Sequence, residues 1–196
     1  MSSALDLRDG VTGGHSSRVA DLAVQLGQRL GMSGDEMQLL KWAALLHDVG
    51  KLGVADDILM KPGPLSVSEW EQMRRHPGYG HSIVGADGFL SQVAEIVYCH
   101  HERFDGKGYP RGLAGDDIPL GARVFAVADA YDAMTSDRPY RPAVSHGEAI
   151  EEIERNAGSQ FDPRVVAAVL QWAWEVSRSG DRRYIALPPP LPVTTG

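Results

Sequence analysis

Apolar residues recur along most of the chain at the three- and four-residue spacing that is typical of amphipathic helices. The clearest example is residues 15–31, a segment that Gly31 is expected to end. One face of this segment carries the apolar side chains Val19, Leu22, Ala23, Leu26 and Leu30. The same spacing predicts helices over 33–50, 91–101 and 162–178. No segment shows convincing period-two alternation, so the pattern predicts an all-α fold.

Three Ser-x-x-Glu sequences have the form of a capping box, in which the serine and glutamate side chains satisfy backbone N–H groups at a helix start. They are Ser33 with Glu36, Ser66 with Glu69, and Ser145 with Glu148. The second is expected to open a short helix that Pro77 halts. The apolar run 123–134 predicts a buried helix, although its first half also fits a strand. Together these elements predict a single helical domain.

Composition narrows the class of protein. The chain has 196 residues, enough for one good hydrophobic core and few for two. Its net charge of −7 argues against general binding to nucleic acid or to a membrane surface, which favours basic faces. An anionic substrate would need local positive charge, which metal ions can supply. Cys99 is the one cysteine, so no intrachain disulfide can form, and cytoplasmic localisation is expected. No apolar stretch reaches the roughly 20 residues that span a bilayer.

Histidines and aspartates form a spaced series at or beside the ends of the expected helices. Five of the seven histidines belong to it. The series is His15, His47, Asp48, His76, His100, His101 and Asp129. These side chains are enough to hold two metal ions with one carboxylate left to bridge them. Imidazole with carboxylate suits Fe, Mn, Co or Zn better than a thiolate-seeking metal.

Asp48 is the natural bridge, because an aspartate can bind one metal with each oxygen and a single imidazole nitrogen cannot. Taken alone, His47 and Asp48 also fit a core histidine beside a capping aspartate. Asp129 lies in an apolar segment, where an unpaired carboxylate would be costly to bury. His15 and His76 each fit a surface or helix-end position when considered singly, so the prediction depends on the whole series.

Several long motifs in this order resemble the HD phosphohydrolase signature in its HD-GYP form. The resemblance covers about residues 9–170. The matching segments are His47-Asp48-Val-Gly-Lys51-Leu-Gly, Ile58-Leu-Met-Lys-Pro-Gly63, His100-His-Glu-Arg-Phe-Asp-Gly-Lys-Gly-Tyr-Pro110, Asp129-Ala-Tyr-Asp-Ala-Met-Thr-Ser-Asp-Arg-Pro-Tyr140 and Gly158-Ser-Gln-Phe-Asp-Pro163. The resemblance implies an HD-domain helical bundle. The pattern of elements places this catalytic domain over 10–180 after a lead-in over 1–9, and the proline-rich tail over 181–196 is expected to be disordered.

The resemblance also implies an activity. Members of this family are metal-dependent phosphodiesterases that hydrolyse cyclic di-GMP, a bacterial second messenger, to linear pGpG and often on to GMP. By position, one metal would be held by His15, His47, Asp48 and Asp129, and the second by Asp48, His76, His100 and His101. Lys51 matches the lysine that contacts the scissile phosphate. Further substrate contacts are expected at Tyr109, Asp132, Arg138 and Arg141.

The chain departs from the family at one position. Members with a third metal carry a glutamate four residues before the first histidine, where this chain has Val11. Valine cannot bind a metal, so two metals are expected and a third is not. Iron or manganese is favoured, with Zn, Co and Ni as alternatives. Asp48 and Lys51 are the expected catalytic residues, acting with a hydroxide that bridges the two metals.

Two other functions stay open. One is hydrolysis of another cyclic dinucleotide or a nucleotide by the same centre. The other is a catalytically silent signalling module that binds a diguanylate cyclase or a regulatory partner. Homodimerisation through an exposed helix face is compatible with the sequence. The tryptophans are expected mainly to pack, although an aromatic side chain near the mouth of the site could stack on a guanine.

Overall fold

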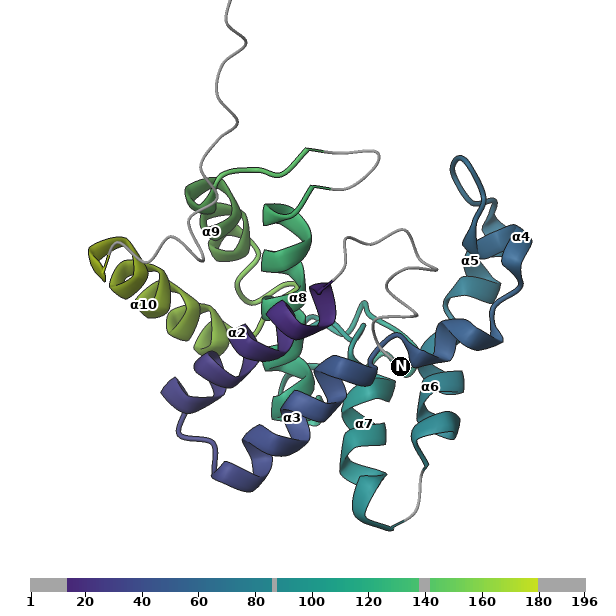
Figure 1. Cartoon of the computed structure of the whole chain (residues 1–196), viewed down its shortest axis with the longest axis horizontal. Coiled ribbons are helices and arrows are strands. Elements are labelled where there is room, and N and C mark those ends of the chain that lie inside the picture. The colour runs from purple at the N-terminus through teal and green to yellow at the C-terminus, as the bar shows by residue number, and fades with distance from the viewer. Residues whose placement is uncertain (1–13, 86–87, 138–141, 180–196) are drawn as a thin grey trace, which may run out of the picture.

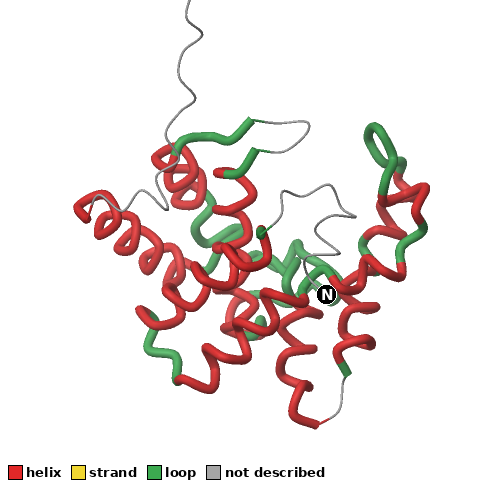
Figure 2. Tube along the Cα trace, viewed as in Figure 1, coloured by secondary structure: helices red, strands yellow, loops and turns green. Residues whose placement is uncertain are grey.

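The computed structural model describes residues 14–85, 88–137 and 142–179 as a bundle of α-helices joined by loops and short 3-10 turns (Figures 1 and 2). Within those ranges no strand is formed, so the all-α prediction is confirmed. The α-helices are α2 (His15–Arg29), α3 (Gly34–Leu46), α4 (Asp56–Leu59), α5 (Val67–Met73), α6 (His76–Val84), α7 (Ser91–Cys99), α8 (Leu120–Thr135), α9 (His146–Arg155) and α10 (Pro163–Ser179). The 3-10 turns are η1 (Val49–Gly53), η2 (Gly88–Leu90) and η3 (Gly115–Asp117).

All three capping boxes are confirmed. In each, the serine hydroxyl accepts a hydrogen bond from the backbone N–H three residues later, and the glutamate accepts one from the serine N–H. They open α3, α5 and α9 as the sequence predicted. The ambiguous apolar run belongs to α8, so its first half is helix and not strand.

The prediction for Pro77 is wrong. The helix that begins after Ser66 already ends at Met73, and Pro77 lies in the first turn of the next helix, α6. Proline is well tolerated there, because the first N–H groups of a helix have no partner within it and the proline ring already holds a helical φ. His76 therefore opens a helix, and the short 91–101 segment that follows forms α7 up to Cys99.

The hydrophobic core lies between the helices in two adjoining parts. The larger part joins α2, α3, α8, α9 and α10 around fully buried Phe125 and Trp172. The smaller part joins α3, α7 and the start of α8 and contains Cys99, a buried free cysteine. Helix α8 contributes to both parts and passes through the middle of the molecule (Figure 1).

Gly50 allows a close crossing that brings the two halves of the histidine series together. A Cβ atom on Gly50 would lie 1.8 Å from the carbonyl oxygen of His76 and 2.4 Å from the backbone nitrogen of Gly80. No side chain fits in that space, so only glycine lets η1 pack directly against α6. This contact places the segment after His47 beside the start of α6.

Some expectations fall outside the described residues. They are the lead-in over 1–9, Val11, Arg138, Arg141 and the tail over 181–196. Within the described ranges, no helix combines the length and apolar character needed to cross a bilayer.

Candidate metal centre

The structure brings six side chains of the histidine series into two groups of three. Within each group, one nitrogen or oxygen atom from every member lies within 4.8 Å of the others. The first group is His15, His47 and Asp129, and the second is His76, His100 and His101. All six stand at or near the ends of α2, α3, α6 and α7, except Asp129, which lies inside α8.

Asp48 lies between the two groups and offers one oxygen to each. Its Oδ2 is 3.0 Å from Nε2 of His47, and its Oδ1 is 3.6 Å from Nε2 of His76. The Nζ of Lys51, one turn further along η1, donates a hydrogen bond of 2.8 Å to Oδ2. A carboxylate in this position can contact two cations at once, which is the arrangement expected from the sequence.

Backbone carbonyls orient three of the histidine rings. Each ring places Nδ1 within hydrogen-bond distance of the carbonyl oxygen three residues earlier in the chain. The pairs are His47 with Ala44 at 2.8 Å, His76 with Met73 at 2.8 Å, and His100 with Val97 at 2.6 Å. A carbonyl oxygen only accepts, so Nδ1 carries the proton and Nε2 of the neutral ring has a free lone pair. Histidines that bind metals are held in this way.

The Nε2 atoms of His76 and His100 face each other at 3.2 Å. Because both Nδ1 atoms donate to carbonyls, two neutral rings would point lone pair at lone pair. Such a contact is unfavourable unless a proton or a metal ion lies between or beside the two nitrogens. The donor set therefore fits a bound cation, and borderline metals such as Fe, Mn or Zn suit it.

The second group resists protonation. Burial, reinforced by the neighbouring imidazoles, lowers the pKa of His100 to about 3. Burial, with His100 and His76 adding to it, also holds the pKa of His101 well below its usual value. Both rings therefore stay neutral at physiological pH, the form that binds metals.

In the first group, carboxylates outweigh burial and favour a protonated histidine. Burial lowers the pKa of His15, but Asp129 and Asp132 outweigh it and raise the value to about 9. Burial raises the pKa of Asp48, yet His47 and Lys51 outweigh it and hold the value well below the usual range. This half of the centre is therefore negatively charged at its oxygens and holds a proton that a metal ion would displace.

Asp132 holds the ring of His15. Its Oδ2 is 2.7 Å from Nδ1 of His15, leaving Nε2 to face Asp129 at 3.3 Å. Arg18, one turn along α2, donates from Nε to Oδ1 of this carboxylate at 2.6 Å and from Nη2 to Oδ2 at 3.0 Å. Sequence reasoning did not single out Arg18, although its position one helical turn after His15 is a usable signal.

The loop after His101 folds back over the second group. The ring of Tyr109 stacks on that of His101 with centroids 4.8 Å apart and planes 29° apart. Burial raises the pKa of Tyr109 to about 12, so its hydroxyl keeps its proton. The loop can turn this tightly because Gly108 approaches the backbone of His101 and Arg103 more closely than any Cβ would permit.

Glu102 ties this loop down from within and was missed by the sequence reasoning. Its carboxylate is buried and accepts hydrogen bonds from the backbone N–H groups of Arg111 at 2.7 Å and Leu113 at 3.1 Å. The residue directly follows the histidine pair, which is the one signal the sequence offers. Glu102 thus couples the end of α7 to the far side of the loop.

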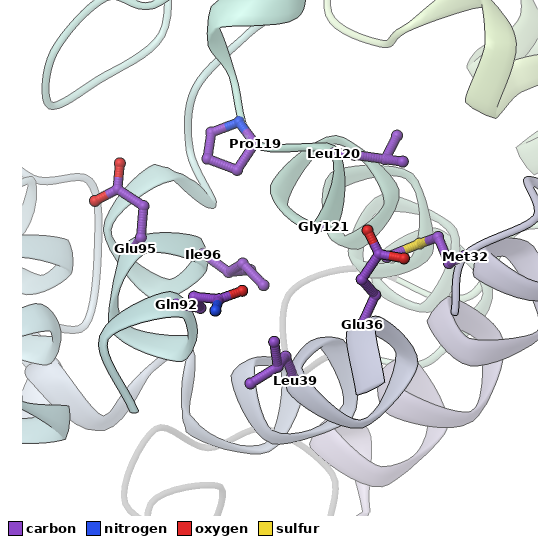
Figure 3. Close-up of a pocket in the computed structure, with 9 residues that line it drawn as sticks. All are labelled: Met32, Glu36, Leu39, Gln92, Glu95, Ile96, Pro119, Leu120 and Gly121. Carbon is purple, nitrogen blue, oxygen red and sulfur yellow. The ribbon is translucent and has the colours of Figure 1, made fainter. Parts of the chain in front are cut away.

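A separate cavity of about 240 Å³ lies between α3, α7 and the start of α8 (Figure 3). Its polar side chains are largely engaged. The carboxylate of Glu36 completes the capping box with Ser33, and that of Glu95 pairs with Arg111. None of its lining residues belongs to the histidine series, so this cavity is separate from the candidate metal centre.

Several curated phosphodiesterases of cyclic dinucleotides are similar to this chain in sequence. The cyclic di-GMP phosphodiesterase response regulator RpfG of Xanthomonas campestris is 40% identical over 173 residues, which cover 87% of this chain and 46% of that protein. A cyclic di-GMP phosphodiesterase of Thermotoga maritima is 41% identical over 174 residues, 88% of this chain and 47% of that one. A 3′3′-cGAMP-specific phosphodiesterase of Vibrio cholerae, number 3, is 39% identical over 165 residues, 84% and 36% of the two chains. The chain thus spans less than half the length of these relatives.

Solved structures share the fold. A crystal structure of a cyclic GMP-AMP specific phosphodiesterase of V. cholerae superposes with a TM-score of 0.70 at 22% identity, covering 93% of this chain and 48% of that one. The model of the family described as HD domain matches residues 1–165. With the motif order and the paired histidine groups, this match shows that the chain belongs to the HD domain family.

Proposed function

We propose that this chain is a metal-dependent phosphodiesterase that hydrolyses cyclic di-GMP to linear pGpG, with further cleavage to GMP as the alternative end point. The observation that carries the proposal is the pair of histidine groups joined by the two oxygens of Asp48, with Lys51 beside them. Three neutral imidazoles that face one another have no use in an ordinary core. The names of the relatives, which are phosphodiesterases of cyclic di-GMP or 3′3′-cGAMP, support the substrate class.

Two metals are proposed, held as the sequence resemblance implies. His15, His47 and Asp129 would hold one, His76, His100 and His101 the other, and Asp48 both. Nitrogen and oxygen donors favour iron or manganese, with Zn, Co and Ni as alternatives. Bound divalent metals in such a pair neutralise charge on phosphoryl oxygens and make water a stronger nucleophile.

The chain's own residues would divide the remaining work. Lys51 brings an ammonium group to Oδ2 of Asp48, where it would stabilise negative charge on the scissile phosphate. Tyr109, as a protonated phenol stacked on His101, can donate to a phosphate oxygen. Contacts from Arg138 and Arg141 remain predictions. For Asp132, the bonds to His15 and Arg18 support a positioning role, in addition to or in place of the predicted substrate contact.

A second candidate substrate is 3′3′-cGAMP, because relatives of the same degree of similarity carry that name. Both cyclic dinucleotides contain guanosine and two 3′–5′ phosphodiester bonds. The two functions would use the same metal centre and differ only in how the second base is held.

The proposal is tested with protein reconstituted anaerobically with Fe(II) or Mn(II) under reducing conditions. Metal content and hydrolysis would be measured on the same sample, with cyclic di-GMP, 3′3′-cGAMP and cyclic di-AMP competing in one reaction. We expect about two metals per chain and fastest loss of a guanosine-containing substrate. Full metal loading with no hydrolysis of any of the three would instead favour a silent signalling module that binds a partner such as a diguanylate cyclase.

A further inference from the structure

One face of α5 is open to solvent and lies next to the metal centre. Val67, Trp70, Glu71 and Arg74 recur along it at helical spacing and line a pocket of about 280 Å³. No side chain of α5 is buried, and Trp70 is 49% exposed. The face is therefore not held in place by the core, and a half-exposed tryptophan there is available to another molecule.

Arg74 connects this face to the metal centre. Its guanidinium carbon lies 6.0 Å from the ring centre of Trp70 and 5.2 Å from that of Tyr109. Tyr109 in turn stacks on His101 of the second histidine group. A ligand whose phosphate lies at the histidine groups could therefore extend past Tyr109 onto the α5 face.

Apart from the aromatic rings beside Arg74, the charged groups of the pocket have no hydrogen-bonding or ionic partner within the described part of the chain. There, neither the carboxylate of Glu71 nor the guanidinium of Arg74 makes a hydrogen bond or an ion pair, although the two residues are three positions apart on one helix. The pocket thus combines the indole ring of Trp70, the carboxylate acceptor of Glu71 and the guanidinium donors of Arg74.

This combination matches guanine. A guanine base offers acceptors at O6 and N7, which an arginine fork binds with two hydrogen bonds. On its Watson–Crick edge it offers donors at N1 and N2, which a carboxylate accepts. Adenine has an unprotonated N1 and lacks the N2 amino group, so a carboxylate would face a lone pair. Either base stacks on an indole ring, because stacking tolerates any base.

We propose that Trp70, Glu71 and Arg74 form a guanine-binding subsite of the substrate site. The inference rests on the proposed cyclic dinucleotide substrate and names the part of the chain that selects its base. Trp70 supplies the stacking plane, Glu71 accepts from N1 and N2, and Arg74 donates to O6 and N7.

Binding of mononucleotides tests the subsite without depending on turnover. Dissociation constants for GMP and AMP would be measured by calorimetry on metal-loaded protein. Glu71→Gln is expected to raise the dissociation constant of GMP on the order of 10- to 100-fold and that of AMP much less. The preference for GMP over AMP should therefore be lost. Trp70→Leu is expected to weaken the binding of both GMP and AMP by roughly 10-fold or more. Trp70→Phe, which keeps an aromatic ring, is expected to retain most of the binding.

The chain offers a matched control. On α10, Trp174, Glu175 and Arg178 repeat the Trp-Glu-x-x-Arg spacing, with Arg178 4.6 Å from the ring centre of Trp174. Trp174 is 59% exposed, and its helix, α10, lies on the opposite side of the molecule from α5 (Figure 1). Trp174→Leu should change neither dissociation constant. An unchanged GMP-to-AMP ratio in Glu71→Gln, or equal losses in Trp70→Leu and Trp174→Leu, would overturn the subsite.

Steady-state kinetics separates this inference from the proposed function. If the subsite is correct, Glu71→Gln lowers kcat/KM for cyclic di-GMP relative to cyclic di-AMP, mainly through KM. Selective GMP binding in a protein that hydrolyses no cyclic dinucleotide would support the subsite and reject the activity. Rapid hydrolysis of cyclic di-GMP by Glu71→Gln with unaltered KM would support the activity and reject the subsite.

Discussion

At the scale of single residues, hydrogen bonds to Nδ1 decide what the histidines can do. Carbonyl oxygens orient His47, His76 and His100, and Asp132 orients His15. Each bond fixes the ring and turns Nε2 toward a shared centre. None of these partners requires a long-range contact except Asp132, which lies 117 positions from His15 in the chain.

Asp48 and Lys51 should separate metal binding from turnover. Asp48→Ala removes the oxygens that lie between the two groups, so metal and activity should be lost together. Lys51→Ala leaves those oxygens in place, so it should keep metal and lower kcat on the order of 100-fold, as loss of one charge-stabilising group does. Metal content by mass spectrometry and kcat on the same samples check this pair. Two metals retained in Asp48→Ala would disprove the bridge.

Asp132→Ala should weaken the metal bound by the first group without touching a direct ligand. The ring of His15 would lose its Nδ1 partner, and metal affinity should fall roughly 10- to 100-fold, as is typical when such a partner is removed. Chelator competition measures the change. Asp21→Ala, on an exposed position of the same helix, is the control and should leave affinity unaltered. Equal affinities in the two variants would contradict the positioning role.

At the scale of elements, the centre depends on helices that meet end to end. The ends of α3 and α7 and the starts of α2 and α6 converge on it, while α8 passes alongside and supplies Asp129. Helix ends suit this task because their last residues leave the regular backbone and can turn toward one another. The packing of η1 against α6 through Gly50 sets the separation between the two groups.

Gly50→Ala should disrupt this crossing. Its Cβ would lie 1.8 Å from a carbonyl oxygen, which belongs to backbone and cannot rotate away. We expect the free energy of unfolding to fall by about 3 kcal/mol or more and metal binding by the second group to weaken, because His76 must move from Asp48. Urea unfolding and metal titration measure the two effects.

Gly147→Ala is the matched control for that substitution. A Cβ there meets no atom within 4 Å, and the position is in α9. Alanine should leave stability unchanged or raise it by up to about 1 kcal/mol, since it favours helix over glycine. If Gly50→Ala lowers the free energy of unfolding no more than Gly147→Ala changes it, then η1 and α6 can move apart without cost and the close crossing is not required.

At the scale of the whole molecule, the centre concentrates buried titratable groups whose charges depend on a cation. Without metal, His15 is protonated at neutral pH, whereas His100 is not. A metal ion would replace the proton on His15 in the first group, and the nitrogen lone pairs of the second group would bind a metal ion. Binding should therefore stabilise the folded state, and its affinity should rise with pH as the proton on His15 is released.

The metal-free protein should be most stable near pH 6.5. The folded-state pKa of His100 is about 3, well below its ordinary value of 6.5. As pH falls below about 6.5, this histidine is therefore protonated in the unfolded chain but not in the folded one, and the free energy of unfolding declines. The raised pKa of His15 acts in the other direction: its contribution is present below about 6.5 and is lost as pH rises through about 9.

Urea unfolding between pH 5 and 9, with and without Mn(II), measures this profile. The decline above pH 6.5 should disappear with metal, because the metal replaces the proton on His15. Stability of the metal-free protein that rises steadily to pH 9 would contradict the charge assignment.

Most of the longer helices, three of the caps and the members of the histidine series could be predicted from the sequence because each depends on residues close together in the chain. Helical spacing and three Ser-x-x-Glu boxes predicted the helices, since a cap needs only residues three positions apart. The seven members of the histidine series were found because imidazoles at successive helix ends are unusual in a core. Pro77 was misread because proline both ends and begins helices, and only the break after Met73 distinguishes the two.

The sequence by itself thus determined most of the longer helices, three of their caps and the candidate donor residues of the centre. Only the tertiary structure decided how those donors divide into two groups, that Asp48 faces both, and that Asp132 and Glu102 hold His15 and the Tyr109 loop. The same is true of Arg74, which reaches Tyr109 across 35 positions of chain. The physical reason is that these contacts join helix ends far apart in sequence, and packing at positions such as Gly50 sets their distances.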